Sequence, residues 1–204
     1  MKNFRKILTA KIVKMIRCYL IIVLLKKLKK IRFIRKVIKY FDPNWLRKIH
    51  GFNYRPNIKI IEWNQKKLFV DINDHIGFRS FIEDEPFEMS VYHVAKELKL
   101  KKDDAILDIG ANIGHASVPI CSELSCYLIA IEASKENASL LLRNICLNNI
   151  KAEVEVSALV TPSYREKFIK LFVRNGNRGA NSLIEKWNPS TIGDEFEWVP
   201  CITL

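Results

Sequence analysis

The stretch that most constrains the fold is ILDIGANIG at residues 106–114. A short apolar run ends near an acid, Asp108, as is typical of a strand buried on both faces in a parallel sheet. Gly110 lets the backbone turn sharply because it has no Cβ, and Gly114 allows a following helix to pack close to the sheet. Asn112 tolerates a left-handed backbone better than most residues. The stretch therefore predicts a strand, a tight loop and a helix.

The residues after this loop repeat the same order of elements. We expect a helix over HASVPICSEL, a second buried strand over residues 126–134, a helix over KENASLLLRNICLNN with Ser134 as its N-cap, and a third strand over residues 152–160. This alternation implies right-handed crossovers between parallel strands. The predicted fold class is α/β, with a Rossmann-like doubly wound parallel sheet.

Two further elements are predicted before the loop. Residues 57–75 alternate between apolar and polar side chains, which predicts a β-hairpin with NQKK near its turn. The stretch PFEMSVYHVAKELKL, residues 86–100, predicts an amphipathic helix. Its apolar face carries Phe87, Val91, Val94 and Leu98.

A second acid indicates the class of ligand. Glu132 lies 24 positions after Asp108, at the end of the second predicted strand. A carboxylate there can accept hydrogen bonds from both hydroxyls of a ribose, so the loop and the acid together predict an adenosine-containing cofactor.

Both NAD(P) and S-adenosylmethionine contain adenosine. The sequence G-A-N-I-G lacks the middle glycine of the dinucleotide fingerprint, and Asp108 would crowd a pyrophosphate but suits the ammonium of a methionine moiety. We therefore expect S-adenosylmethionine, with a bare ligand-free connection as the less favoured alternative.

The stretch ILDIGANIGHASVPI…CYLIAIEASKENASLLLRNICLNN resembles the FkbM family of S-adenosylmethionine-dependent methyltransferases. The shared features are the D-x-G-A-N-x-G loop, the acid followed by a helix, and the asparagines that end this helix, Asn144, Asn148 and Asn149. PFE (86–88), NRGANSL (177–183) and the terminal VPCITL resemble further family segments, so the resemblance covers residues 80–204. It implies a Rossmann-like sheet and methyl transfer, usually O-methylation of a hydroxyl on a glycan or secondary metabolite.

The resemblance also implies which residues bind the cofactor. In the family's pattern the loop residues line the methionine part, the acid at the end of the second strand holds the ribose, and residues at the ends of the second and third strands lie beside the adenine. The expected cofactor-binding residues are Asp108, Gly110, Ala111, Asn112, Gly114, Glu132, Ala133, Ser157 and Ala158. No catalytic base and no metal ligand is identified.

Other polar residues are weaker candidates. His115 stands beside the loop, where it can face the methyl group, although a polar residue at a helix start is the more common role. Arg178 and Asn181 belong to a Gly/Asn-rich loop that can reach an acceptor, but such loops are usually plain connections.

The chain departs from the family at its C-terminus. The family's sheet has seven strands, and its D-x-E-G turn and much of its acceptor pocket belong to a later segment that has no match here. We therefore expect a C-terminally truncated chain, marginally stable and inactive as it stands. The alternative, from another functional class, is a non-catalytic remnant whose basic arm binds a membrane or a partner.

The positive charge is confined to one end of the chain. Residues 1–50 hold 16 Lys and Arg and one acid, Asp42, whereas residues 51–204 hold 18 basic and 21 acidic residues. The net charge of +12 therefore gives no argument for nucleic acid. The arm also lacks interleaved aromatic side chains for stacking, so we expect no nucleic-acid partner.

Apolar residues recur at helical spacing over positions 4–41, so residues 1–48 are predicted to form a basic amphipathic helical arm. Two interpretations stay open: peripheral contact with an anionic membrane, or packing on the acidic domain or on a second copy of the arm. The longest apolar run, residues 18–25, is too short for the roughly 20 residues that cross a bilayer.

The five cysteines, Cys18, Cys121, Cys126, Cys146 and Cys201, include no CxxC pair. We interpret them as free, mostly buried thiols in a reducing compartment. The expected location is the cytoplasm, peripheral at the membrane if the arm binds there. The predicted organisation is the arm at 1–48, a hairpin lead-in at 49–84, and the N-terminal part of the methyltransferase domain at 85–204.

Overall fold

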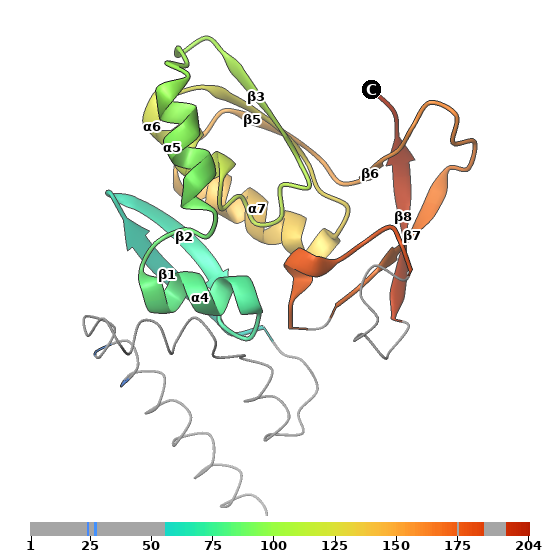
Figure 1. The fold of residues 1–204 in the computed structure, drawn as a ribbon, viewed down its shortest axis with the longest axis horizontal. Coiled ribbons are helices and arrows are strands. Elements are labelled where there is room, and N and C mark those ends of the chain that lie inside the picture. The colour runs from blue at the N-terminus through green and yellow to red at the C-terminus, as the bar shows by residue number, and fades with distance from the viewer. Residues whose placement is uncertain (1–23, 25–26, 28–55, 175, 186–194) are drawn as a thin grey trace, which may run out of the picture.

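The structure is a computed structural model that describes residues 24, 27, 56–174, 176–185 and 195–204 (Figure 1). Its first sheet is an antiparallel hairpin of β1 (Ile58–Trp63) and β2 (Lys66–Asp71). The turn residues Asn64 and Gln65 have φ angles of 45° and 64°, the left-handed conformation that a two-residue hairpin turn requires. The predicted hairpin is therefore confirmed.

Helix α4 (His75–Glu83) follows the hairpin and was not among the predicted elements. Asp74 caps it, because the Asp74 side chain accepts a hydrogen bond from the backbone N–H of Ile76 at 3.1 Å. Gly77 lets the helix approach β2 closely: a Cβ at this position would lie 2.2 Å from the carbonyl oxygen of Asp71. The first turn of α4 is thus fixed against the end of the hairpin.

Helix α5 (Met89–Glu97) confirms the helix predicted over residues 86–100, but a different face is buried. The Tyr92 ring packs edge-on against Trp63, with 4.8 Å between ring centroids, and its hydroxyl donates a hydrogen bond to Glu123. A buried aromatic ring removes more area from water than a valine does, so Tyr92 takes the core position. The expected apolar face is 46%, 59% and 66% exposed at Val91, Val94 and Leu98.

The central sheet is parallel, with strand order β3-β4-β5. Its strands are β3 (Ala105–Ile109), β4 (Tyr127–Ile131) and β5 (Ala152–Glu155). Helix α6 (Ser117–Leu124) connects β3 to β4, and helix α7 (Lys135–Leu147) connects β4 to β5. The α/β class and the Rossmann-like parallel sheet are therefore confirmed.

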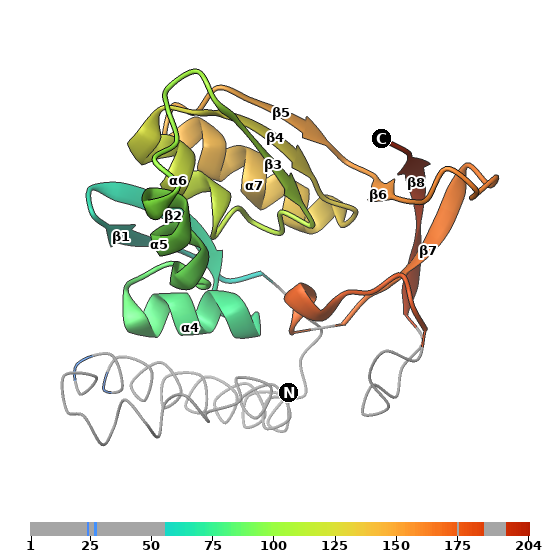
Figure 2. The same cartoon turned by 45° about the horizontal axis from the view of Figure 1, so that its top comes forward.

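The two faces of this sheet differ. Ile106 and Leu128 point towards the helices and pack in one core with Leu141 of α7. Because both crossovers step in the same direction across the sheet, α6 and α7 lie on the same face (Figure 2). On the opposite face Leu107 and Ile109 are 45% and 53% exposed, and in the described part of the chain β3 is an edge strand. The prediction that this strand is buried on both faces was therefore wrong, because α6 and α7 cover only one face of the sheet (Figure 2).

The third predicted strand, over residues 152–160, is split in two. After β5 the chain leaves the central sheet, and β6 (Ala158–Leu159) pairs in parallel with β8 (Phe196–Ile202). Strand β8 also pairs antiparallel with β7 (Phe168–Phe172), so the three strands form a separate sheet beside the central one (Figure 1). The prediction of one continuous strand was wrong because β6 finds its hydrogen-bonding partner near the end of the sequence.

The predicted basic arm, residues 1–48, lies outside the described residues except for Leu24 and Lys27, which are helical and exposed. Among the helices that the structure does describe, none is long and apolar enough to cross a bilayer. Membrane contact through the arm stays a prediction, as do the domain boundaries.

Candidate cofactor site

The loop after β3 folds back over the end of β4. The backbone N–H groups of Gly110 and Ala111 both donate to the carbonyl oxygen of Ile131, at 2.8 and 3.1 Å. Gly110, Asn112 and Gly114 all have positive φ angles, of 76°, 54° and 83°. The left-handed conformation expected at Asn112 is therefore present, and the loop follows the sharp turn that its glycines predict.

The two glycines of the loop serve different purposes. A Cβ on Gly114 would lie 2.5 Å from Cγ2 of Val118 and 2.8 Å from Cδ1 of Leu141. Gly114 thus permits the close helix packing that its position predicts. A Cβ on Gly110 would have no described atom within 4 Å, so this side of the loop is open for a ligand.

Glu132, at the end of β4, holds the loop and the next helix together. It is only 7% exposed, and its Oε2 accepts from the backbone N–H of Asn112 at 2.7 Å. Its Oε1 accepts from the backbone N–H of Ser134 at 2.8 Å and from the Asn137 side chain at 3.5 Å. Since a carboxylate has about four acceptor positions, one ribose hydroxyl can be added directly. A second can bind if it replaces the long contact with Asn137.

The electrostatics at Glu132 involve two opposing effects. Burial raises the pKa of the Glu132 carboxyl, and the nearby charge of Asp108 raises it further, whereas the N–H donors from Ser134, Asn112 and Asn137 lower it. Asp108 itself is half-buried. Two carboxylates therefore stand close together at the carboxyl ends of adjacent parallel strands, the edge at which open α/β sheets bind ligands.

The residues expected beside the adenine also reach this region. Ala133 packs against the small core that contains Ala158, and Leu183 packs on the same core. Ser157 is 1% exposed, and its Oγ has no hydrogen-bonding partner among the described residues. All the sequence-predicted positions therefore gather at one end of the sheet, although their binding role stays a prediction.

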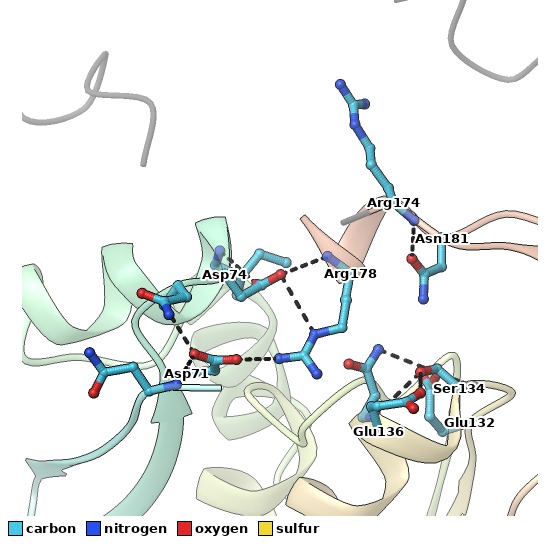
Figure 3. Close-up of polar contacts among 12 residues, drawn as sticks. Asp71, Asp74, Glu132, Ser134, Glu136, Arg174, Arg178 and Asn181 are labelled. Carbon is cyan, nitrogen blue, oxygen red and sulfur yellow. Dashed lines mark hydrogen bonds and ion pairs between the residues drawn. The ribbon is translucent and has the colours of Figure 1, made fainter. Parts of the chain in front are cut away.

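The segment around Arg178 is bound to the start of α4 (Figure 3). Nη2 of Arg178 lies 2.7 Å from Oδ2 of Asp71, and its backbone N–H donates to Oδ2 of Asp74 at 2.7 Å. Arg178 belongs to the short 3-10 helix Arg178–Ala180, and a Cβ on Gly179 would lie 3.2 Å from Nδ2 of Asn112. The segment therefore borders the loop.

These contacts assign Arg178 a structural role rather than the acceptor-binding role considered for the Gly/Asn-rich loop. Arg178 is 8% exposed and its guanidinium is committed to two carboxylates, so it does not reach for an acceptor. Oδ1 of Asn181 accepts from the backbone N–H of Arg174 at 2.9 Å, a contact within the segment. Arg178 thus organises the segment itself, whereas Nδ2 of Asn181 is buried and has no hydrogen-bonding partner among the described residues.

His115 is a buried residue. It precedes α6 rather than opening it, it is 4% exposed, and its Nε2 lies 3.0 Å from Oγ of Ser80 on α4. Burial lowers its pKa to about 3, so the ring is neutral at pH 7. It joins α4 to the loop.

The described cysteines are all free thiols, but only Cys121 and Cys126 are buried, whereas Cys146 is exposed and Cys201 half-buried. Burial raises the pKa of Cys121 to about 12, which suppresses the reactive thiolate. Within the described ranges no cluster of acids, histidines and cysteines could hold a metal ion.

The sequence pattern missed several residues that shape the site. Asp74 carries a local signal, since an aspartate before an apolar helical stretch is a common N-cap. The pairing of Asp71 with Arg178 joins positions 107 apart in the sequence, for which a single sequence contains no local signal.

No family model and no curated protein matches the chain, so membership of the FkbM family stays a prediction. Solved structures that it resembles include the M. jannaschii tRNA m1G37 methyltransferase, with a TM-score of 0.40 and 20% identity over 56% of this chain and 37% of that one. Another is P. horikoshii TYW2 in complex with MeSAdo, with a TM-score of 0.37 and 19% identity over 63% of this chain and 56% of that one. A third is the Pyrococcus abyssi tRNA (uracil-54, C5)-methyltransferase in complex with S-adenosyl-L-homocysteine. Its TM-score is 0.37, with 13% identity over 53% of this chain and 29% of that one. The matched parts span less than two thirds of each of these proteins.

Proposed function

We propose that this chain is an S-adenosylmethionine-dependent methyltransferase, or part of one. The observation that carries the proposal is the position of Asp108, the glycine loop and Glu132. They meet at the carboxyl ends of two adjacent parallel strands, and the Glu132 carboxylate accepts a hydrogen bond from the loop at 2.7 Å. This arrangement provides one carboxylate for a cationic group and one for hydroxyl groups, on either side of a loop that is open at Gly110.

The roles of the residues follow from their chemistry. Asp108 pairs with the ammonium of the methionine moiety, and Glu132 accepts from a ribose hydroxyl. Ala133, Ser157 and Ala158 border the adenine. When bound, S-adenosylmethionine supplies an electrophilic methyl group on a sulfonium. The protein's task is then to hold donor and acceptor in line.

The acceptor class rests on the sequence resemblance alone. We propose O-methylation of a hydroxyl on a glycan or secondary metabolite. Such a reaction needs a base for the hydroxyl proton, and none of the described residues is assigned that role.

Calorimetry on the full chain with S-adenosylhomocysteine and S-adenosylmethionine tests the cofactor. We expect Glu132→Ala to weaken binding by about 1.5–3 kcal/mol, because a charge-assisted hydrogen bond is lost, which is roughly 10- to 150-fold in the dissociation constant. Glu155→Ala is the matched control, since Glu155 is an exposed acid at the end of the next strand.

Equal affinities of wild type and Glu132→Ala would remove the ribose assignment, and tighter binding of NAD than of S-adenosylmethionine would show that the cofactor class is wrong. Binding without methyl transfer to any hydroxyl acceptor would favour a non-catalytic binding protein.

A further inference from the structure

Two asparagines on α7 bind the free edge of β2. Oδ1 of Asn144 accepts from the backbone N–H of Phe69 at 2.6 Å, and its Nδ2 donates to the Phe69 carbonyl at 3.2 Å. One helical turn later, Asn148 does the same for Lys67, at 3.2 and 2.7 Å. Each side-chain amide thus makes the two hydrogen bonds that a neighbouring strand would make.

The match has a geometric basis. Residues four apart on a helix are separated by about 6 Å along the axis, and residues two apart on a strand by about 6.6 Å. Asn144 and Asn148 are four positions apart in the sequence, whereas Phe69 and Lys67 are two apart. The backbone N–H and carbonyl groups of Phe69 and Lys67 point in the same direction, away from β1. We call this pair of contacts the amide ladder. It attaches the hairpin to the central α/β unit.

The two asparagines differ in burial, since Asn144 is fully buried and Asn148 half-buried, and in the third hydrogen bond that each amide makes. Nδ2 of Asn144 also donates to the carbonyl oxygen of Ile113 at 2.8 Å, inside the glycine loop. Ile113 lies between Asn112 and Gly114, which both have positive φ angles. Its carbonyl oxygen therefore belongs to neither a helix nor a strand. Asn148 instead donates its additional hydrogen bond to the Asn144 carbonyl at 2.8 Å, within its own helix.

We propose that Asn144 is a positioning residue for the cofactor loop, and that through it the docking of the hairpin on α7 sets the loop conformation. The proposal rests on the function proposed above. Asn144 is fully buried and does not itself border the open side of the loop. Its effect on the cofactor passes through the Ile113 carbonyl, which it fixes between two residues with positive φ angles.

Asn148 serves as the control for Asn144. Asn144→Asp and Asn148→Asp remove the same donor atom from neighbouring rungs, and each keeps an oxygen for the strand N–H. Only the first change breaks a contact with the loop. With S-adenosylhomocysteine as the probe, we expect the dissociation constant to rise about tenfold or more for Asn144→Asp, because a buried carbonyl of the loop loses its donor. For Asn148→Asp it should change less than about threefold, since the hydrogen bonds that this change removes lie outside the loop.

Hydrogen exchange gives a readout that lost stability alone does not produce. In Asn144→Asp the amide of Gly114, which donates to Ala111 within the loop at 2.8 Å, should exchange faster relative to the amide of Ala138 in α7. In Asn148→Asp this ratio should be unchanged. The neutral pair Asn144→Ser and Asn148→Ser is measured alongside with the same comparisons, because a new charge costs more at the fully buried position 144 than at the half-buried position 148. This pair also replaces the first if Asn144→Asp does not fold.

Equal changes in affinity and in the exchange ratio for the two members of a pair would overturn the proposal. If the wild type binds no S-adenosylhomocysteine, the proposed function fails, while the exchange ratios still decide whether Asn144 holds the loop.

Discussion

At the scale of single residues, His115 is the residue whose protonation the fold opposes most clearly. It is 4% exposed, and Oγ of Ser80 is the polar partner of its Nε2, at 3.0 Å. Burial lowers its pKa to about 3 from the ordinary value of 6.5. Below pH 6.5 the unfolded chain therefore binds a proton at this position that the folded chain does not bind until the pH falls to about 3.

We predict that the free energy of unfolding falls between pH 6.5 and pH 3 partly because of His115, with a slope of up to about 1.4 kcal/mol per pH unit. His115→Gln retains a polar partner for Ser80 but cannot take up a proton, so its stability should depend less steeply on pH. Urea unfolding of both proteins at pH 7, 6 and 5 measures the difference. Parallel slopes would show that His115 is solvated when folded.

At the scale of elements, the ion pairs of Arg178 join the end of β2, at Asp71, and the N-cap of α4, Asp74, to the segment after β7. Both Asp71 and Arg178 are buried, and Asp71 also accepts from the backbone N–H groups of Asn57 and Asn73 through Oδ1, at 2.9 and 3.0 Å. Removing one member of a buried pair leaves an uncompensated charge, which costs more than the pair itself contributes.

Arg178→Met should therefore lower the free energy of unfolding by about 3–5 kcal/mol. Arg165→Met, at an exposed position, should change it by less than about 0.5 kcal/mol. Adding Asp71→Asn to Arg178→Met should restore part of the loss, because the fully buried carboxylate of Asp71 is then no longer left without its cation, whereas that of Asp74 still is. Denaturant titration measures all four proteins. Similar losses for the two arginine variants would mean that Arg178 is solvated.

At the scale of the whole molecule, one face of the central sheet presents exposed apolar side chains in the part of the chain that the structure describes. Leu107 and Ile109 are exposed on β3, which is also an unpaired edge in the described part of the chain. Exposed apolar strands at a sheet edge promote association between chains. We therefore predict that the protein tends to aggregate through β3.

The double variant Leu107→Thr and Ile109→Thr should reduce aggregation in light scattering, since threonine keeps the preference for strands while removing the apolar surface. Its free energy of unfolding should stay within about 1 kcal/mol of wild type. Leu128→Thr, in the core on the opposite face, should destabilise strongly. A comparable loss in the double variant would reveal that another part of the chain covers this face.

The sequence alone determined the parts that depend on neighbouring residues. The β3–loop–α6 unit follows from a short apolar run, two glycines and an asparagine, because glycine and asparagine tolerate positive φ angles and Gly114 permits close helix packing. Ser134 was predicted as the N-cap of α7, and its side chain accepts from the backbone N–H of Asn137. Residues 57–75 were predicted as a hairpin from alternation and a high content of Ile and Val, and β1 and β2 form it over residues 58–71.

Only the tertiary structure decided which surfaces meet. It buried Tyr92 of α5 in place of the valine face, took β6 out of the central sheet to pair with β8, and joined Arg178 to Asp71. It also placed Asn144 against Phe69 and Ile113. These contacts connect residues far apart in the chain, and their energies depend on the removal of several segments from water at once. Local backbone preferences contain no information about such partners, so a pattern in one sequence predicts the elements and the loop but not the contacts that hold them together.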